Sequence, residues 1–436
     1  MRDPRPLLSL LFVAGCGTVA PMGVAPDDDD DAADDDDSTE VAPLCPDGLT
    51  DAPEGAFIEQ GLLGASGTRS DCAVVTHATA GGDGSTLQVT LDGWTGTGGA
   101  TLEVLDLLGA VVASESGLVA GDSLEVTLDR AGEWLLRLAP DAVEEPSNTY
   151  SLDVDCVAGC EARFTRYPVV LVHGMAGADA YLGGYPYWYQ VLPDLQADGY
   201  LAFTPAVDAL APPPSRAQQW SAILDQLQAD GMGRRFNLLG HSQGGIDSRY
   251  LASTMDQGAR IASITTLATP HYGSGLADVA NGVIETTPTL AGLVEDGVSL
   301  LTDAIGLGEA QLVFATEAMT RPAMVQFNLD NPDHADVRYF SWSARSCGFT
   351  ELGCQAEMDA EVIAPYLVPT YRALQLIDGD NDGIVPTESA IWGEHLGTIG
   401  ADHFDEVGQL AGQTDGNWDH RAFFLGECFR LAEAGL

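Results

Sequence analysis

The chain has 436 residues, of which 65 are acidic and 18 are basic, giving a formal net charge of −47. All 18 basic residues are arginine, which excludes a P-loop, a pyridoxal phosphate Schiff base and a Ser-Lys hydrolase, because each needs a lysine side chain. The charge also argues against nucleic acids and anionic membranes as partners, since their phosphates are neutralised by Lys and Arg.

The first 16 residues have the order of an export signal. Arg2 and Arg5 precede an apolar run, Leu7 to Ala14, that is too short to span a bilayer. The segment VAGC, ending at Cys16, resembles a bacterial lipobox. We therefore expect residues 1–16 to be a lipoprotein signal peptide and lipobox. A lipid on Cys16 would then anchor the protein to the outer membrane of a bacterium. Ordinary signal cleavage followed by secretion is the alternative.

Residues 17–43 contain the run PDDDDDAADDDDSTE. Like charges repel and nothing apolar is available for burial, so this segment predicts a disordered acidic linker. A metal cage is the weaker alternative, because a flexible acidic run does not preorganise ligands.

Residues 44–160 alternate apolar and polar positions between Gly- and Asp-rich breaks, which predicts a small β-sandwich. GEWLLRLAP and NTYSLDVDC are similar to the accessory sandwich domains of secreted bacterial hydrolases. No cluster in this segment indicates chemistry, so we expect a binding or spacing role. The inward positions would be Leu87, Val89, Leu91, Leu124, Val126, Leu128, Trp134, Leu136, Leu138, Tyr150, Leu152 and Val154.

Eight cysteines in an exported chain imply disulfides. Cys347 and Cys354 could close a short loop, and the four cysteines of the sandwich region could pair among themselves. If Cys16 carries a lipid, Cys428 is left over. The four are Cys45, Cys72, Cys156 and Cys160.

Strands and helices alternate in residues 161–436, which predicts a mainly parallel α/β sheet. A helix follows Ser215, a candidate N-cap, with Trp220, Ile223, Leu224 and Leu227 on one face. We expect strands at Val169–Val172, Phe236–Leu239, Ile261–Leu267, Val337–Trp342 and Leu374–Ile377.

The stretch FNLLGHSQGG places Ser242 in a G-x-S-x-G turn between a strand and a helix at Ile246–Leu251. This is the arrangement of a nucleophile elbow, where Gly240 and Gly244 avoid clashes with the adjoining strand and helix. A serine nucleophile needs a base and an acid, which should follow in the order Asp, His. Spacing alone does not choose the base among His271, His334, His395, His403 and His420.

From Tyr167 to Gln413 the chain resembles the calcium-dependent triacylglycerol lipases of Pseudomonas and Burkholderia type, which have the α/β-hydrolase fold. The matching blocks occur in family order: YPVVLVHGM, FNLLGHSQGG, ATPHYGSGLAD, FSWS, NDGIV and HFDEVGQL. The resemblance implies an α/β-hydrolase domain over residues 161–436 that cleaves acylglycerol esters through an acyl-enzyme.

The resemblance also implies roles for single residues. Ser242 would be the nucleophile, Asp382 the acid and His403 the base, with the backbone N–H groups of Met175 and Gln243 forming the oxyanion hole. His173 and His241 would be structural.

The acid region has a competing interpretation. DGDNDG, from Asp378 to Gly383, matches the first half of an EF-hand loop, but Ser389 stands at the twelfth position where glutamate is needed. We expect Asp382 to be the acid and Asp380 to be the reserve candidate.

In the resembled family a calcium ion fixes the loop that carries the histidine. The corresponding ligands here are the carboxylates of Asp359 and Asp405 and the carbonyls of Gln409 and Gln413. Ordinary acidic surface residues are the alternative. Many members of the family also need a membrane-bound foldase, which is a further expected partner.

Residues 272–324 correspond to the mobile lid of the family, and Leu290, Leu293, Val294 and Val298 have helical spacing. Packed helices without such motion are the alternative. The chain departs from the family in its sandwich, its acidic linker and one missing cysteine after NDGIV. A carboxylesterase, phospholipase or polyester hydrolase of the same fold therefore stays open, as does a binding protein on a hydrolase scaffold.

Overall fold

The computed structural model describes residues 49–50, 65–68, 75–94, 98–141, 149–177, 186–305, 316–354, 362–409, 411–412, 414 and 418–436. The expected signal peptide, lipid anchor and acidic linker lie outside these residues. So do Cys45, Cys72, Asp359 and Gln413.

The N-terminal strands form two sheets with a shared apolar interior. All twelve positions expected to face inward are buried, because strand residues that alternate in polarity place one set of side chains on the inner face of each sheet. Strand pairs are antiparallel except β1 with β3. One sheet has the order β1 (Leu49–Thr50), β3 (Val75–Gly81), β8 (Gly132–Pro140), β5 (Ala100–Leu105), β6 (Val111–Leu118); the other has the order β2 (Ala65–Thr68), β9 (Thr149–Ala158), β4 (Thr86–Trp94), β7 (Asp122–Thr127).

A third sheet, formed by residues after Cys160, is parallel throughout, and the sequence predicted a mainly parallel sheet there. A parallel sheet needs helical crossovers, and these are the helices that interleave with its strands along the chain. Its order is β11 (Ala202–Phe203), β10 (Val169–Val172), β12 (Phe236–His241), β13 (Ile261–Leu267), β14 (Arg338–Ala344), β15 (Glu394–Ile399).

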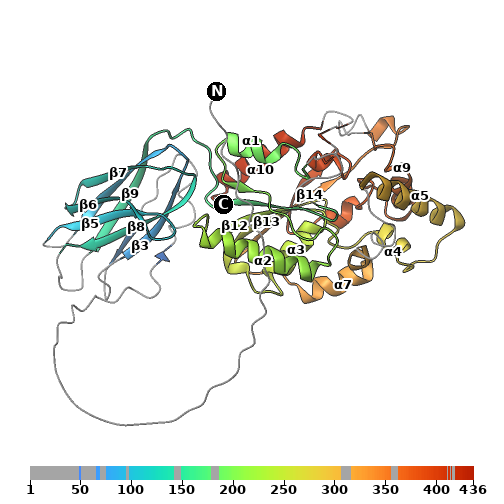
Figure 1. Cartoon of the computed structure of the whole chain (residues 1–436), viewed down its shortest axis with the longest axis horizontal. Helices are drawn as coiled ribbons and strands as arrows, with labels where there is room; N and C mark the ends of the chain where they lie inside the picture. The colour runs from blue at the N-terminus through green and yellow to red at the C-terminus, as the bar shows by residue number, and fades with distance from the viewer. Residues whose placement is uncertain are drawn as a thin grey trace, which may run out of the picture. The chain divides into compact units, whose positions relative to one another are not determined.

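Strand β10 explains the layers on either side of this sheet. Val169 and Leu171 join one apolar cluster, whereas Val170 and Val172 join another, because successive side chains point to opposite faces. The first cluster is covered by α1 (Val191–Ala197) and α10 (His420–Glu433), and the second by α2 (Pro213–Ala229) and α3 (Gln243–Ala252) (Figure 1). Both faces of the strand are buried, which is why it reads as an unbroken apolar run.

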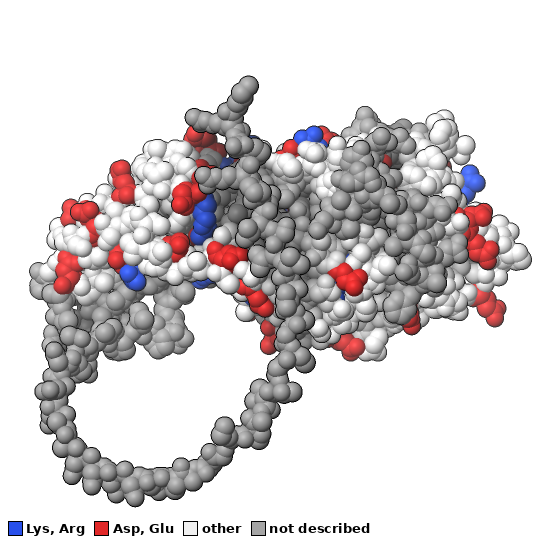
Figure 2. Space-filling view, viewed as in Figure 1, with Lys and Arg blue, Asp and Glu red and all other residues white. Residues whose placement is uncertain are grey.

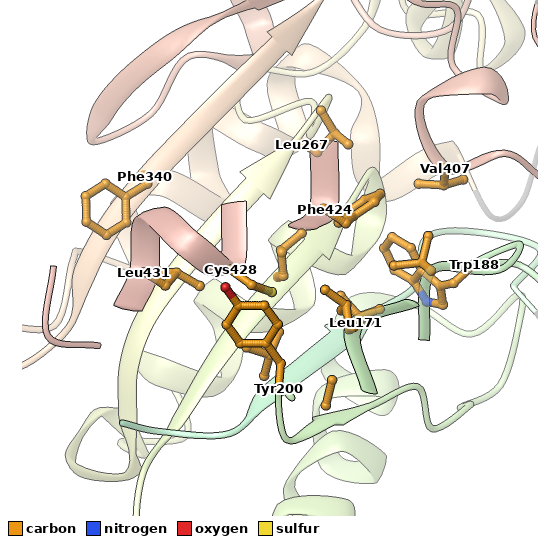
Figure 3. Close-up of a cluster of buried hydrophobic side chains, with 14 of the residues drawn as sticks. Leu171, Trp188, Tyr200, Leu267, Phe340, Val407, Phe424, Cys428 and Leu431 are labelled. Carbon is orange, nitrogen blue, oxygen red and sulfur yellow. The ribbon is translucent and has the colours of Figure 1, made fainter. Parts of the chain in front are cut away.

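The cysteines partly follow expectation. Cys347 pairs with Cys354, and Cys156 pairs with Cys160. Cys428 is a free, buried thiol on α10, and Figure 3 shows it beside Tyr200 in the first apolar cluster.

Two local predictions are wrong. Leu374–Ile377 is not a strand but the end of helix α9 (Val368–Ile377), because Ala373 and Leu374 pack against the apolar side of another helix. Ser215 lies inside α2 rather than at its cap, since the prolines at 212–214 start the helix earlier and Pro suits the first helical turn.

The segment expected to form a lid, residues 272–324, contains helices joined by turns where it is described. It contains α4 (Gly275–Ala280), α5 (Pro288–Ile305), the 3₁₀ turn η2 (Glu317–Met319) and the start of α7 (Arg321–Asp330). Val294 of α5 packs with Leu374 of α9 in one apolar cluster. The remaining 3₁₀ turns are η1 (Gly258–Arg260), η3 (Thr387–Ala390) and η4 (Asp405–Val407). Among the residues described, none of the helices is both long and apolar enough to cross a membrane.

Candidate active site

Ser242 occupies a strained turn between β12 and α3. Its backbone has φ 54° and ψ −126°, a conformation that is costly for a residue with a side chain. The glycines on either side are required by space. A Cβ on Gly244 would lie 2.0 Å from the Val172 carbonyl oxygen, and one on Gly240 would lie 2.7 Å from the Gly245 nitrogen. The expected reason for both glycines is therefore confirmed.

Three side chains from distant parts of the chain form one hydrogen-bonded row. Ser242 Oγ lies 3.0 Å from His403 Nε2, and His403 Nδ1 lies 2.9 Å from Asp382 Oδ2. The other oxygen of Asp382 accepts hydrogen bonds from the N–H groups of Ile384 (2.8 Å) and Val385 (2.6 Å). The backbone N–H of His403 also donates to the backbone carbonyl of Asp382, at 3.1 Å. These contacts hold the imidazole plane between the hydroxyl and the carboxylate.

The neighbouring carboxylates point elsewhere. Asp378 pairs with Arg321, and Asp380 pairs with Arg345 at 3.1 Å, so neither joins Asp382. An EF-hand needs these three side chains to converge on one ion, and they diverge. The other four histidines after Ser242 bond to different groups: His271 to Thr266, His334 to Asp336, His395 to Ser341 and His420 to Tyr189.

The segment after β10 lies directly beside Ser242. A Cβ on Gly174 would come within 2.8 Å of the Ser242 Cβ. The backbone N–H groups of Met175 and Gln243 donate no hydrogen bond to any described residue. Unpaired backbone N–H groups next to a serine oxygen are what an oxyanion hole supplies.

Arg216 of α2 holds the segment after β10 in place through hydrogen bonds to its backbone. Its guanidinium donates to the carbonyl oxygens of His173 (2.5 Å) and Gly174 (3.2 Å) and forms an ion pair with Asp247 at 2.6 Å. Both charged side chains have no exposed surface. Burial, followed by the charge of Arg216, lowers the pKa of His173 to about 4, and burial raises the pKa of Asp247 to about 6. His173 is therefore neutral near pH 7, as its expected structural role requires.

A second buried row lies behind the histidine. His241 Nδ1 is 2.5 Å from the Tyr187 hydroxyl, and His241 Nε2 is 2.7 Å from Glu406 Oε2. That glutamate oxygen is also 3.7 Å from His403 Nδ1. Burial raises the pKa of Glu406 well above its usual range, helped by the charge of Asp382, and burial lowers the pKa of His241.

His241, His403 and Glu406 could together offer three ligand atoms to a metal. Their bonds to Tyr187, Ser242 and Asp382 instead use these atoms within the protein.

The hydroxyl of Ser242 opens into an apolar cavity of about 110 Å³. One wall is formed by Met175 after β10, Ile384 after Asp382 and Phe404 after His403. The other wall comes from the expected lid region, and its residues are Ser274, Leu276, Ala277, Ala280, Val298, Thr316 and Met319. A cavity of this kind accepts an apolar group whose reacting atom reaches the serine.

The described calcium candidates lie on the loop after His403. Asp405 begins η4 and is buried, and Gln409 is buried as well. Asp402 is a buried carboxyl beside them, and burial together with the charge of Asp405 raises its pKa to about 8. Buried carboxylates crowded in this way are the oxygen ligands that suit a hard cation.

Sequence reasoning missed four buried groups around the site: Arg216, Asp247, Tyr187 and Glu406. Glu406 is in the quoted HFDEV block, three residues after the histidine, and this spacing on a turn was the available signal. Arg216, Asp247 and Tyr187 are not part of any motif that the sequence analysis used.

The comparisons with known proteins agree with this geometry. The family model described as "alpha/beta hydrolase fold" matches residues 167–292. A triacylglycerol lipase of Vibrio cholerae serotype O1 is 30% identical over 301 residues, covering 62% of this chain and 89% of that protein. Triacylglycerol lipases of Burkholderia plantarii and Pseudarthrobacter phenanthrenivorans are each 29% identical, covering 66% and 58% of this chain and 91% and 92% of those proteins. The chain therefore belongs to the triacylglycerol lipase family of α/β hydrolases, and is an ester hydrolase.

Proposed function

We propose that this protein hydrolyses acylglycerol esters by forming an acyl-enzyme on Ser242. The observation that carries the proposal is the hydrogen-bonded row from Ser242 through His403 to Asp382, which opens into an apolar cavity. A protein that only binds a partner does not need a serine, a histidine and an aspartate hydrogen-bonded in this order beside a cavity.

The mechanism follows from the positions of the side chains. His403 Nε2 takes the proton of the Ser242 hydroxyl as the oxygen attacks the ester carbon. Asp382 holds the other ring nitrogen and stabilises the imidazolium that forms. The oxyanion lies against the N–H groups of Met175 and Gln243, and each such donor contributes about 3 kcal/mol to transition-state stabilisation. His403 then protonates the departing alcohol, and water releases the acid by the same steps.

We also propose that calcium occupies the loop after His403. Asp405 and the carbonyl of Gln409 would hold it, together with Asp359 and the carbonyl of Gln413. The crowding of Asp402 and Asp405 supports a cation there, because its charge would offset their repulsion. When bound, the ion would stabilise the loop that carries His403. A melting temperature that does not change on chelation would contradict this proposal.

From the sequence we further propose that the protein is exported, that a foldase assists its folding and that residues 272–324 form a mobile lid. The protein would be exported and anchored through a lipid on Cys16, and the family's foldase would assist its folding. Mass spectrometry of the mature N-terminus tests the anchor: an unmodified residue other than Cys16 would contradict it. Turnover that rises steeply once the substrate forms droplets would support a mobile lid over residues 272–324.

The small cavity favours a second specificity within the same fold, a carboxylesterase acting on short acyl chains. At about 110 Å³ the space suits a few methylene groups unless the wall from the lid region moves. A series of nitrophenyl esters of increasing chain length separates the two: a maximum at butyrate supports the esterase, and a maximum at eight carbons or more supports the lipase.

The central test compares wild type with Ser242→Ala on nitrophenyl butyrate and on emulsified tributyrin, with and without EDTA. We expect the variant to lose at least about 10⁴-fold in kcat while keeping the wild-type melting temperature. Retained hydrolysis in Ser242→Ala would overturn the assignment of the nucleophile.

A further inference from the structure

Three large apolar side chains are exposed near the segment that leads to Asp382. Phe349 is 84% exposed, Leu352 is 73% exposed and Leu376 is 70% exposed. Phe349 and Leu352 lie inside the loop closed by the Cys347–Cys354 disulfide, and Leu376 lies on α9. We call these three side chains the apolar knob.

Hydrogen bonds tie this loop to the helix. Glu351 accepts from the Gly348 N–H (3.0 Å), from the Tyr371 hydroxyl (2.8 Å) and from Gln375 Nε2 (2.6 Å). Glu351 is next to Leu352 in the chain, and Gln375 is next to Leu376, so these bonds hold the loop against the end of α9 that carries Leu376. The disulfide and these bonds hold the loop in position, and an ordered apolar protrusion loses little conformational entropy when it is covered.

The knob is on the outer side of the helix that backs the cavity. On its inner side, α9 packs Leu374 against Val294 of α5, and Val298 of α5 lines the cavity next to Ser242. A Cβ on Gly297 would come within 2.4 Å of Thr370 Cγ2, so the two helices touch closely. Whatever covers the knob therefore lies near α5, which lines the cavity.

The charge of the protein indicates which kind of surface can cover the apolar knob. The protein carries a net charge of −47, and acidic side chains are spread over the face shown in Figure 2. Helix α9 carries one charge, Arg372, and the loop carries one, Glu351, which is already bonded. A second copy of this chain, or an anionic lipid, would be repelled by the surrounding charge, whereas an uncharged surface would not.

We propose that the apolar knob adsorbs to the surface of uncharged acylglycerol droplets and so holds the cavity at the oil surface. The choice of acylglycerol rests on the proposed function, but adsorption itself does not require catalysis. It is measured in the Ser242→Ala background, so that droplets are not consumed.

The test is flotation with triolein droplets, scored as the partition coefficient of the protein. Phe349→Ser with Leu352→Ser should lower this coefficient at least about tenfold, and Leu376→Ser should lower it further. The matched control is Val325→Ser with Leu329→Ser on α7, whose side chains are 62% and 72% exposed. The control pair should change the coefficient less than about twofold.

Several results would overturn the proposal: an unchanged coefficient in the knob variant, an equal loss in both pairs, or stronger adsorption to phosphatidylserine vesicles than to triolein. A dimer in sedimentation that the knob variant dissociates, with droplet adsorption unchanged, would identify a second copy as the occupant. If the double variant folds poorly, Phe349→Ser alone decides, because that side chain is almost wholly outside the fold. Failure of the proposed function would show separately, as nitrophenyl butyrate hydrolysis that Ser242→Ala does not abolish.

Discussion

The interior of the sandwich and the edge of the parallel sheet around Ser242 are both buried, but they bury different things. The sandwich interior is an apolar cluster in which Leu102, Leu152 and Val89 have no exposed surface. Around Ser242, the side chains of Arg216 and Asp247 have equally little. Apolar burial stabilises by about 25 cal/mol per Å², whereas a buried ion pair is often no better than an apolar pair of the same size. We infer that the polar network persists because it positions reacting groups.

The largest effect that would sharpen this comparison is on the acid. Asp382→Asn should lower kcat by about 10⁴-fold on nitrophenyl butyrate, because the amide no longer favours the imidazole tautomer or its charged form. The melting temperature should change little, since the side chain keeps its shape. Asp380→Asn is the matched control and should keep wild-type kinetics, because that carboxylate pairs with Arg345 at the surface. Equal losses in both variants would show that the acid is assigned wrongly.

The next effect concerns Arg216, which bonds to the backbone carbonyls of the oxyanion segment. Arg216→Met should lower kcat by about 10²-fold or more and destabilise the fold by about 3–5 kcal/mol, since Asp247 would be left as an unpaired buried charge. Adding Asp247→Leu should restore most of the stability but not kcat. Denaturant unfolding and ester kinetics measure the two quantities. If stability and kcat recover together in the double variant, Arg216 has no positioning role.

The sandwich should respond in the opposite way. Leu102→Ala removes a fully buried side chain from the apolar cluster and should cost about 2–5 kcal/mol in unfolding free energy. Hydrolysis of a soluble ester should keep its kcat and KM within about twofold, as no sandwich residue lines the cavity at Ser242 among those described. A large fall in kcat would mean that the two regions are less independent than their interiors suggest.

The smallest effect is a dependence of stability on pH. The pKa of His173 is lowered from its usual value to about 4, so the folded state holds this ring neutral. Its contribution to stability is complete above about pH 6.5 and is lost as pH falls towards 4, because the unfolded chain binds the proton first. Between about pH 6.5 and 4, the unfolding free energy of the wild type should therefore fall more steeply than that of His173→Gln, by about 1 kcal/mol per pH unit.

Asp247, whose pKa is raised to about 6, has the opposite sign: it favours the folded state at low pH, and this is lost as pH rises through 6. Asp247 is present in both the wild type and His173→Gln, so its contribution to the pH dependence largely cancels when the two proteins are compared. Parallel pH profiles for wild type and His173→Gln would contradict the neutral histidine.

By itself, the sequence determined the elements whose physics is local. Four of the five predicted strands are found. The clearest is Val169–Val172, an unbroken apolar run, because both faces of a central strand in an α/β sheet are buried. The elbow at Ser242 was equally readable, since its glycines are required by contacts with the next strand and helix. Leu374–Ile377 was misread, because three apolar residues within four positions have no period that separates a strand from the last turn of a helix.

Only the tertiary structure decided which polar groups meet. The order of residues left five histidines open, and the choice of His403 came from a family resemblance; the fold brings its ring to Ser242 across 161 residues of chain. It also separates Asp382 from Asp378 and Asp380, which the sequence places side by side. Arg216, Asp247 and Tyr187 could not be assigned in advance, because a buried ion pair or hydrogen bond depends on distances that no local pattern contains.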